Sequence, residues 1–311
     1  MTTGVDSIRG LIPPLTTPLT DDGQVDGTSL ERLCTFLLTA GVDGLFVGGS
    51  SGEAALLSDS QRALVIEVAV GAAAGQVPVV AGVIDTGTNR VIDHAQAAAK
   101  RGASAVVSTG PFYVAPHPDE VVRHFRLLSR AVDIPVIAYD IPSATHTSLP
   151  RAAVEELAAA GTIAGLKDSS GDITAFRQLL TATRGTGLRV FTGSETVTDL
   201  ALQLGAHGQV PGLANVDPDG YVRIGQAAAI GDWPAAAAEQ ERLLRLFTII
   251  DVADRTRIGF TAGALGAFKA AQYLRGVIAT PRCADPLLPL ADTEIDTIRD
   301  ILIREGIAVQ R

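Results

Sequence analysis

One lysine of this chain directly follows a strand-like apolar run. The sequence contains only three lysines, Lys100, Lys167 and Lys269. Lys167 comes after the residues TIAGL, and because burial favours a neutral amine, it is a candidate nucleophile that forms a Schiff base with a keto group. Spacing alone favours a simpler interpretation, in which it pairs with Asp168 or another carboxylate. Lys100 ends an amphipathic segment and Lys269 lies in a late helical segment, so both are interpreted as surface or edge residues.

Two of the four tyrosines also follow strand-like runs. Tyr139 ends the run IPVIAY, and Tyr113 follows AVVSTG in the segment Pro111-Phe112-Tyr113. A phenol close to the Lys167 amine would pass protons to and from a substrate. A ring at the rim of the fold with a satisfied hydroxyl explains each tyrosine equally well.

The stretch GLFVGGSSGEA has two interpretations. Gly48, Ser50 and Gly52 form the G-x-S-x-G pattern of a serine-hydrolase nucleophile elbow, with Asp199 and His207 following in the required order. The same residues can instead form a loop that holds an anion. Only one strand-like run precedes Ser50, whereas several precede a nucleophile elbow, and no H-G-G-G stretch comes before it. The anion-holding loop is therefore favoured.

The histidines show no metal-ligand spacing such as H-E-x-x-H, so no metal is expected. Only His146 closely follows a strand-end candidate, and it is either a substrate contact or a solvated loop residue. The five histidines are His94, His117, His124, His146 and His207.

Eight short apolar runs must position these side chains. They recur roughly every 25 to 30 residues with helix-like segments between them, as in βα units. The runs are GLIPPL, GLFVGG, VPVVAGV, AVVSTG, IPVIAYD, TIAGLKD, LRVFTG and HGQVPG. Eight nearly continuous apolar repeats in about 215 residues predict an α/β fold, a closed (β/α)8 TIM barrel. Its chemistry is expected at the carboxyl ends of the strands.

The pattern becomes purely helical after about residue 216. We predict a barrel catalytic domain over residues 1–230 and a C-terminal helical layer over residues 231–311. Thr88 is predicted to cap the helix NRVIDHAQAAAK, whose Val91, Ala95 and Ala98 fall on one face.

Composition narrows the class of protein. The chain has 311 residues, 47% of them hydrophobic, and a formal net charge of −9, which argues against nucleic acid and anionic membranes as partners. Cys34 and Cys283 lie far apart and are interpreted as reduced core thiols. The segment MTTGVDSIRG has no secretion-signal pattern, and no apolar run reaches ~18 residues. A cytoplasmic globular protein is expected.

Three motifs together resemble the dihydrodipicolinate synthase and N-acetylneuraminate lyase family of class I aldolases. Gly49-Ser50-Ser51-Gly52-Glu53 resembles the family's G-T-T-G-E loop, with serine in place of threonine. YDIPSATH, which starts at Tyr139, resembles Y-N-x-P-x-x-T-G, and GLKDSSG resembles G-x-K-x-x-x-G. The resemblance spans nearly the whole chain.

The resemblance implies a role for each matched residue. Lys167 would form the imine with pyruvate or another 2-oxo acid, and Tyr139 would be the proton shuttle. Ser50 and Ser51 would hold the pyruvate carboxylate, and Ser50 would link Tyr139 to Tyr113, a tyrosine that family members often receive from a neighbouring subunit. Further expected substrate-binding positions are Gly49, Gly52, Gly193, Val210, Ala144 and His146. No metal or other cofactor is implied, and a homotetramer built from dimers is expected.

Departures from the motifs bear on the substrate. Ala144 stands where true dihydrodipicolinate synthases carry an arginine for the aldehyde's carboxylate, and losing that partner would cost about 2 to 5 kcal/mol. His146 replaces a glycine. The expected enzyme is therefore a pyruvate-dependent carbon–carbon lyase acting on a 2-oxo-3-deoxy sugar acid or related aldehyde. Alternatives are a 4-hydroxy-tetrahydrodipicolinate synthase, disfavoured by Ala144, a Schiff-base dehydratase or hydratase-aldolase, and a non-catalytic sensor of 2-oxo acids.

Overall fold

Eight parallel strands form the centre of the molecule. The computed structural model describes residues 7–310. Residues 1–6, the first part of the segment MTTGVDSIRG, therefore lie outside the described residues. The strands are β1 (Gly10–Leu11), β2 (Leu45–Val47), β3 (Val79–Gly82), β4 (Ala105–Ser108), β5 (Val136–Asp140), β6 (Gly165–Asp168), β7 (Arg189–Thr192) and β8 (Gly208–Gln209). Strands β2 to β8 pair in chain order, and β8 pairs with β1.

The segment after β1 closes the barrel. Pro14 forms a parallel bridge with Phe46 of β2, and the Leu15 N–H donates to the Phe46 carbonyl at 2.8 Å. Each of the eight predicted runs contains one of these strands, so the (β/α)8 barrel is confirmed.

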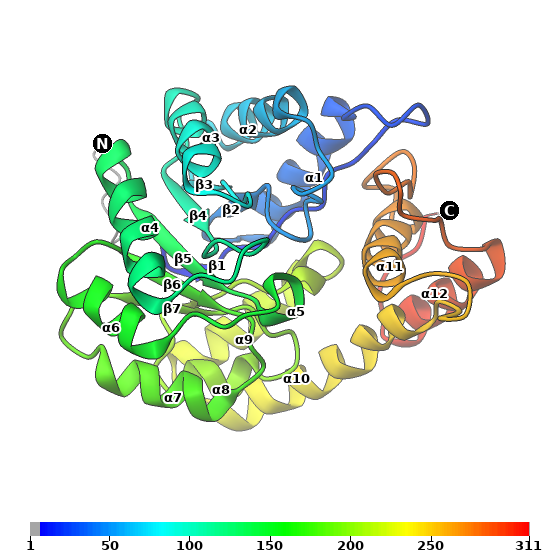
Figure 1. The fold of residues 1–311 in the computed structure, drawn as a ribbon. Coiled ribbons are helices and arrows are strands. Elements are labelled where there is room, and N and C mark those ends of the chain that lie inside the picture. Colours follow the sequence, from blue (N-terminus) through cyan, green and yellow to red (C-terminus); the bar gives the residue numbers. More distant parts are fainter. Residues whose placement is uncertain (1–6, 311) are drawn as a thin grey trace.

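Helices follow the strands and cover the outside of the barrel (Figure 1). They are α1 (Gly27–Ala40), α2 (Asp59–Ala73), α3 (Thr88–Lys100), α4 (Pro118–Ala131), α6 (Arg151–Ala159), α7 (Ile173–Ala182), α8 (Thr198–Gln203) and α9 (Pro218–Ala229). Two shorter elements lie in loops after strands, namely α5 (Pro142–Thr145) after β5 and the 3-10 helix η2 (Gly212–Asn215) after β8.

The start of α3 differs from the expectation. Gly87 occupies the N-cap position, and Thr88 is the first helical residue. The prediction of a Thr88 cap was wrong because its hydroxyl instead lies 3.0 Å from Nδ1 of His124, a buried residue of α4. The predicted inner face of α3, with Val91, Ala95 and Ala98, is buried as expected.

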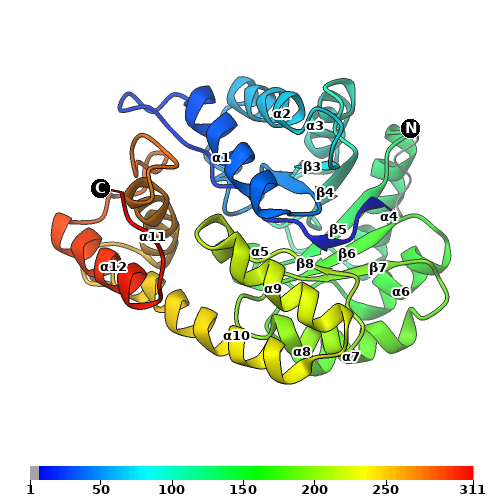
Figure 2. The same ribbon diagram turned by 180° about the vertical axis from the view of Figure 1, so that it is seen from behind.

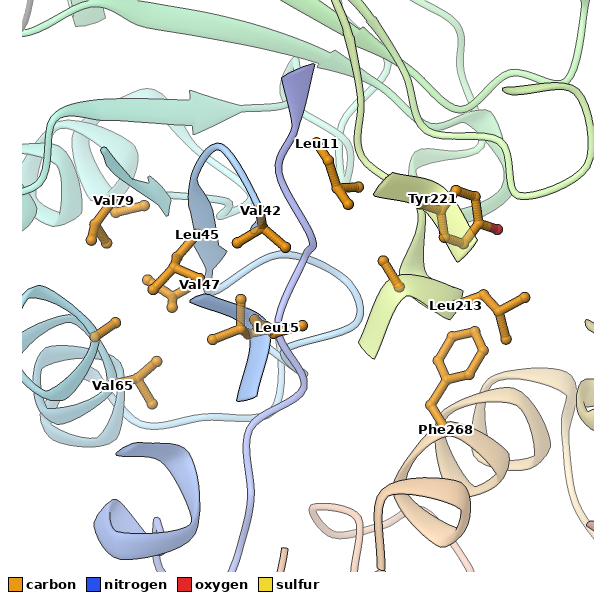
Figure 3. Close-up of a cluster of buried hydrophobic side chains, with 14 of the residues drawn as sticks. Leu11, Leu15, Val42, Leu45, Val47, Val65, Val79, Leu213, Tyr221 and Phe268 are labelled. Atoms are coloured by element: carbon orange, nitrogen blue, oxygen red, sulfur yellow. The ribbon is translucent and has the colours of Figure 1, made fainter. Parts of the chain in front are cut away.

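Two apolar clusters stabilise the barrel. The smaller fills its interior and includes Phe46, Ile137 and Phe191. The larger lies between the strands and the surrounding helices, and Figure 3 shows part of it. Cys34 belongs to this larger cluster, and Cys34 and Cys283 are both buried and free, as predicted.

A group of C-terminal helices follows the barrel (Figure 2). It consists of α10 (Trp233–Phe247), the 3-10 helix η3 (Thr248–Asp251), α11 (Phe260–Leu274) and α12 (Asp292–Arg304), which confirms a helical extension. The predicted division at residue 230 falls in the turn between α9 and α10 and stays a prediction. Phe268 of α11 points toward Leu213 of η2 (Figure 3), so this helix reaches the barrel.

Lys269 of α11 is fully buried, and its interpretation as a surface or edge residue was wrong. Its ammonium group forms an ion pair with Glu53, which lies in the loop after β2. Helical periodicity could not reveal this contact because it depends on where α11 packs. No helix within residues 7–310 is long and apolar enough to cross a membrane.

Candidate active site

Lys167 and Tyr139 lie side by side at the carboxyl end of the barrel. They are register partners on β6 and β5, and the Lys167 Nζ lies 4.2 Å from the centroid of the Tyr139 ring. The same nitrogen lies 5.1 Å from the centroid of the Phe46 ring. Only 5% of Lys167 is exposed, so two aromatic rings shield the amine from bulk solvent.

The barrel interior forms an apolar floor beneath the amine. A cavity of about 20 Å³ is lined by Lys167 and by aliphatic and aromatic side chains, among them Ile12, Phe191 and Val210. Val210, a predicted substrate-binding residue, therefore lines a cavity that the lysine also reaches.

Ser169 contacts the Tyr139 hydroxyl and was missed in the sequence. Its Oγ donates to the Tyr139 Oη at 3.4 Å. Side chains two residues apart share a face of a strand, so the position of Ser169 two residues after Lys167 was the available signal. The hydroxyl beside the phenol is thus supplied by the lysine's own strand end.

Gly193, which follows β7, leaves space for the lysine. A methyl group there would lie 2.1 Å from Ser169 Oγ and 2.8 Å from Lys167 Cε. Any larger residue would displace both side chains, so packing requires glycine at this predicted substrate-side position.

The serine loop, residues 48–53, leaves the barrel at the end of β2. Ser50 is exposed and Ser51 is partly buried. A methyl group at Gly49 would lie 2.8 Å from the Phe46 ring, and one at Gly52 would lie 3.0 Å from the Leu15 carbonyl oxygen. The two glycines therefore let the loop pack closely against the barrel.

Glu195 is a second residue that the sequence did not reveal. Its Oε1 accepts a hydrogen bond from the Gly212 N–H at 2.8 Å. A methyl group at Gly212 would lie 3.1 Å from Glu195 Oε1 and 3.2 Å from Ser51 Oγ, so both polar groups converge on this glycine. Burial raises the pKa of Glu195, while the Gly212 N–H and the charge of Lys167 partly oppose that rise. Its position just after β7 was the only sequence signal.

The remaining predicted residues lie away from the lysine or in solvent. Tyr113, in the loop after β4, is 87% exposed. Ala144 and His146 are exposed at α5, and His146 has a φ of 58°. That left-handed conformation is one that glycine adopts at little cost, consistent with His146 replacing a glycine.

Asp140 also lies near this edge of the site. It ends β5 beside Asp168 of β6, and its Oδ1 accepts a hydrogen bond from the Leu149 N–H at 3.0 Å. Burial raises the pKa of Asp140 to about 6, and the neighbouring Asp168 contributes to the rise. A cavity of about 40 Å³ beside it is also lined by Tyr139.

The residues of the hydrolase alternative are not assembled. Ser50 follows the carboxyl end of β2, whereas His207 precedes the amino end of β8. The His207 Nδ1 accepts a hydrogen bond from the Val190 N–H at 3.1 Å. Because parallel strands place these two ends on opposite sides of a barrel, no Ser–His contact forms.

A dedicated metal centre is not evident in the described part of the chain. Within residues 7–310, no group of three or more histidine, cysteine, aspartate or glutamate side chains is placed to hold an ion. The polar groups around Lys167 are hydroxyls and the Glu195 carboxyl, which suit an oxygen-rich organic ligand.

Proteins of one family resemble this chain over nearly its whole length. Residues 7–304 match the model of the dihydrodipicolinate synthetase family. A 4-hydroxy-tetrahydrodipicolinate synthase of Methanosarcina barkeri is 32% identical over 299 residues, covering 96% of this chain and 99% of the relative. An uncharacterised DapA-like lyase of Halobacterium salinarum is 35% identical over 288 residues, covering 92% of this chain and 90% of the relative.

Solved structures agree with this assignment. YagE, a prophage protein of E. coli K12 from the dihydrodipicolinic acid synthase family, was crystallised with pyruvate; it has a TM-score of 0.90 at 27% identity, covering 97% of this chain and 99% of its own. The pyruvate complex of a dihydrodipicolinate synthase from Acinetobacter baumannii has a TM-score of 0.88 at 28% identity. The match covers 97% of this chain and 100% of that synthase chain. The chain therefore belongs to the dihydrodipicolinate synthetase family of pyruvate-dependent carbon–carbon lyases.

Proposed function

We propose that this enzyme forms a Schiff base between Lys167 and pyruvate, or the pyruvate end of a 2-oxo acid, and cleaves or forms the bond to a hydroxylated aldehyde. The observation that carries the proposal is the shielded Lys167 amine, 4.2 Å from the Tyr139 ring at the mouth of an apolar barrel. The pyruvate complexes of the two structural relatives support the choice of 2-oxo acid.

The chemistry follows from the imine. The Lys167 amine adds to the keto carbon and water leaves, and the protonated imine accepts the electron pair of the breaking carbon–carbon bond. The resulting enamine takes up a proton at carbon, and water then releases pyruvate from the lysine. Tyr139 is the proposed proton carrier, and the Ser169 hydroxyl, 3.4 Å from its oxygen, holds the phenol in place.

Binding of the carboxylate is assigned to the serine loop. Ser50 and Ser51 would donate from their hydroxyls and backbone N–H groups, with Gly49 and Gly52 allowing the close approach. Neutral donors suit a carboxylate held beside the protonated imine, because the imine supplies the compensating positive charge.

The part of the site away from the serine loop suits a hydroxylated substrate better than aspartate semialdehyde. Ala144 offers no cation for a second carboxylate, and it lies exposed on α5. Glu195, by contrast, accepts hydrogen bonds, so it suits substrate hydroxyl groups. A 2-oxo-3-deoxy sugar acid carries both the pyruvate end and the hydroxyl groups that this arrangement would bind.

Two related reactions remain as alternatives. The name of the Methanosarcina relative favours a 4-hydroxy-tetrahydrodipicolinate synthase, and Ala144→Arg should then raise condensation with aspartate semialdehyde. The enclosed Glu195 carboxyl favours a dehydratase, since a carboxyl with a raised pKa can protonate a leaving hydroxyl. A screen of 2-oxo acids that measures both pyruvate release and water loss separates aldol cleavage from dehydration, and consumption of pyruvate with aspartate semialdehyde tests the synthase reaction.

Borohydride trapping tests the imine directly. With pyruvate and borohydride, mass spectrometry should find one reduced pyruvyl group, on the peptide that contains Lys167. Lys167→Ala should abolish trapping and turnover, whereas Lys100→Ala, which removes an exposed lysine at the end of α3, should change neither. Substantial turnover in folded Lys167→Ala would exclude the mechanism. Absence of trapping in the wild-type protein would favour a non-catalytic 2-oxo acid sensor.

We further propose that the enzyme works in the cytoplasm as a homotetramer built from dimers. The exposed Tyr113, accessible over 87% of its surface in a single chain, supports an interface at the loop after β4. No nucleic acid or membrane partner is proposed, in keeping with the net charge of −9.

A further inference from the structure

The buried ion pair between Glu53 and Lys269 joins the serine loop to a distant part of the chain. Both side chains are 0% exposed. Glu53 ends the serine loop, and Lys269 lies in α11, which belongs to the C-terminal helices. Each charge must be paired because an isolated ion in such a place costs several kcal/mol.

Each member of the pair also makes a backbone contact. The Lys269 Nζ donates to the Arg282 carbonyl oxygen at 2.7 Å, and the second Glu53 oxygen accepts from the Ala284 N–H. The pair thereby connects the loop after β2, helix α11 and residues 282–284. Glu53 is the only residue of the serine loop in these contacts, so the N–H and hydroxyl groups of Ser50 and Ser51 can donate to a ligand.

The loop backbone is held from the other side as well. The Thr17 hydroxyl donates to the Gly52 carbonyl oxygen at 2.8 Å, and Glu53 has a φ of 58°. A residue other than glycine in this left-handed conformation costs roughly 1 to 3 kcal/mol and persists only where its surroundings fix it. The carboxylate contacts of Glu53 provide that fixation two residues after Ser51.

Helix α11 presents further buried groups to the barrel mouth. Phe268 contacts Gly212, against which Glu195 and Ser51 also lie. Gln272, one turn beyond Lys269, accepts a hydrogen bond from the Thr16 hydroxyl at 2.8 Å. The face of α11 that carries these residues therefore supports the loops after β1, β2 and β8 together.

We infer that Glu53 and Lys269 are positioning residues that hold the serine loop in the geometry that binds the substrate carboxylate. This inference rests on the proposed function of that loop. An apolar pair of similar volume would often give equal or greater stability, whereas a charged pair with two backbone contacts fixes one arrangement. The pair therefore acts through the position of Ser50 and Ser51 without touching the substrate.

Three variants test the inference in the full-length protein: Glu53→Gln, Lys269→Met and the double variant. Each single change leaves one buried charge unpaired and should lower Tm, whereas the double variant removes both charges and should recover part of that loss. The KM for pyruvate should rise roughly ten- to a hundredfold in all three, with a much smaller change in kcat. Trapping at Lys167 should need correspondingly more pyruvate.

A second, partly exposed ion pair within the C-terminal region provides the control. Arg257→Met breaks the contact between Arg257 and Glu294, which joins the turn before α11 to α12. It should lower Tm without changing the KM for pyruvate. A wild-type KM in the folded double variant would overturn the positioning role, whereas failure of the wild-type protein to trap pyruvate would instead contradict the proposed function.

Discussion

His124 of α4 is buried and faces both α3 and β4. Its Nδ1 lies 3.0 Å from the Thr88 hydroxyl, and its Nε2 lies 3.5 Å from that of Ser108. Burial lowers the pKa of His124 to about 4 from an ordinary value of 6.5. The neutral ring fits this site, and protonation would place a charge in a buried position where both ring nitrogens face neutral hydroxyl groups.

The lowered pKa predicts a stability loss in acid. The unfolded chain takes up the proton first, so the His124 contribution is complete above pH 6.5 and is lost as the pH falls toward 4. The loss should reach about 3 kcal/mol. The raised pKa of Asp140 acts in the opposite direction, but it is present in any His124 variant and cancels in a comparison.

His124→Gln isolates this contribution. At pH 7 the variant should melt below the wild-type protein, because glutamine does not reproduce the packing of the ring. The difference in Tm should shrink steadily between pH 6.5 and pH 4.5 as the wild-type protein pays the cost of protonation. A difference that stays constant over this range would mean that His124 does not titrate as predicted.

Strand position explains which site residues the sequence could reveal. Lys167 and Tyr139 end apolar runs, so their place at the barrel mouth follows from the fold class alone. Ser169 and Glu195 lie in loops, whose side-chain directions are set by tertiary contacts. Lys269 was misinterpreted for a related reason, since its partner Glu53 lies 216 positions earlier in the chain.

The loop after β7 shows how an element constrains Lys167, the proposed nucleophile. Gly193 packs directly against Ser169 Oγ and Lys167 Cε. Gly193→Ala should therefore displace the lysine, and a shift of about 1 Å can lower kcat/KM by roughly a hundredfold. Pyruvate trapping should slow in parallel, because the same amine is the proposed nucleophile in both reactions.

Gly87→Ala is the matched control for this change. Gly87 precedes α3 with a φ of −139°, and a methyl group there would meet nothing within 4 Å. This variant should keep wild-type kcat/KM and a similar Tm. Equal kcat/KM in Gly193→Ala and the wild-type protein would show that the lysine tolerates a methyl group beside it.

The strand lengths depart from the apolar runs for a physical reason. The run GLIPPL covers residues 10–15, but β1 contains only Gly10–Leu11. Pro13 and Pro14 have no backbone N–H to donate, so a regular ladder cannot continue through them. The chain still closes the barrel, because the Pro13 carbonyl oxygen accepts a hydrogen bond from the Phe46 N–H.

The C-terminal helices change how the whole molecule is understood. Their periodicity predicted a helical layer but not its contact with the barrel mouth. The buried polar groups of α11, Lys269 and Gln272, pair with residues of the loops after β2 and β1. A chain truncated before α11 is therefore expected to lose the fixed serine loop as well as the helices.

Tyr113 makes a prediction about the complete assembly. If it enters the site of a neighbouring subunit, Lys167→Ala and Tyr113→Phe place both of their defects in the same site of a mixed dimer. One of the two sites then has both a wild-type lysine and a wild-type Tyr113. When the two inactive variants are unfolded together and refolded, statistical mixing should restore about a quarter of wild-type activity.

A second mixture controls for this recovery. Lys167→Ala mixed with Tyr139→Phe should regain nothing, because Lys167 and Tyr139 are register partners in one barrel and must come from the same chain. Every site in that mixture lacks one of them. Recovery only in the Tyr113 mixture therefore requires that this tyrosine, 87% exposed in a single chain, acts across a subunit interface. Equal activity in the two mixtures would place the complete site within one subunit.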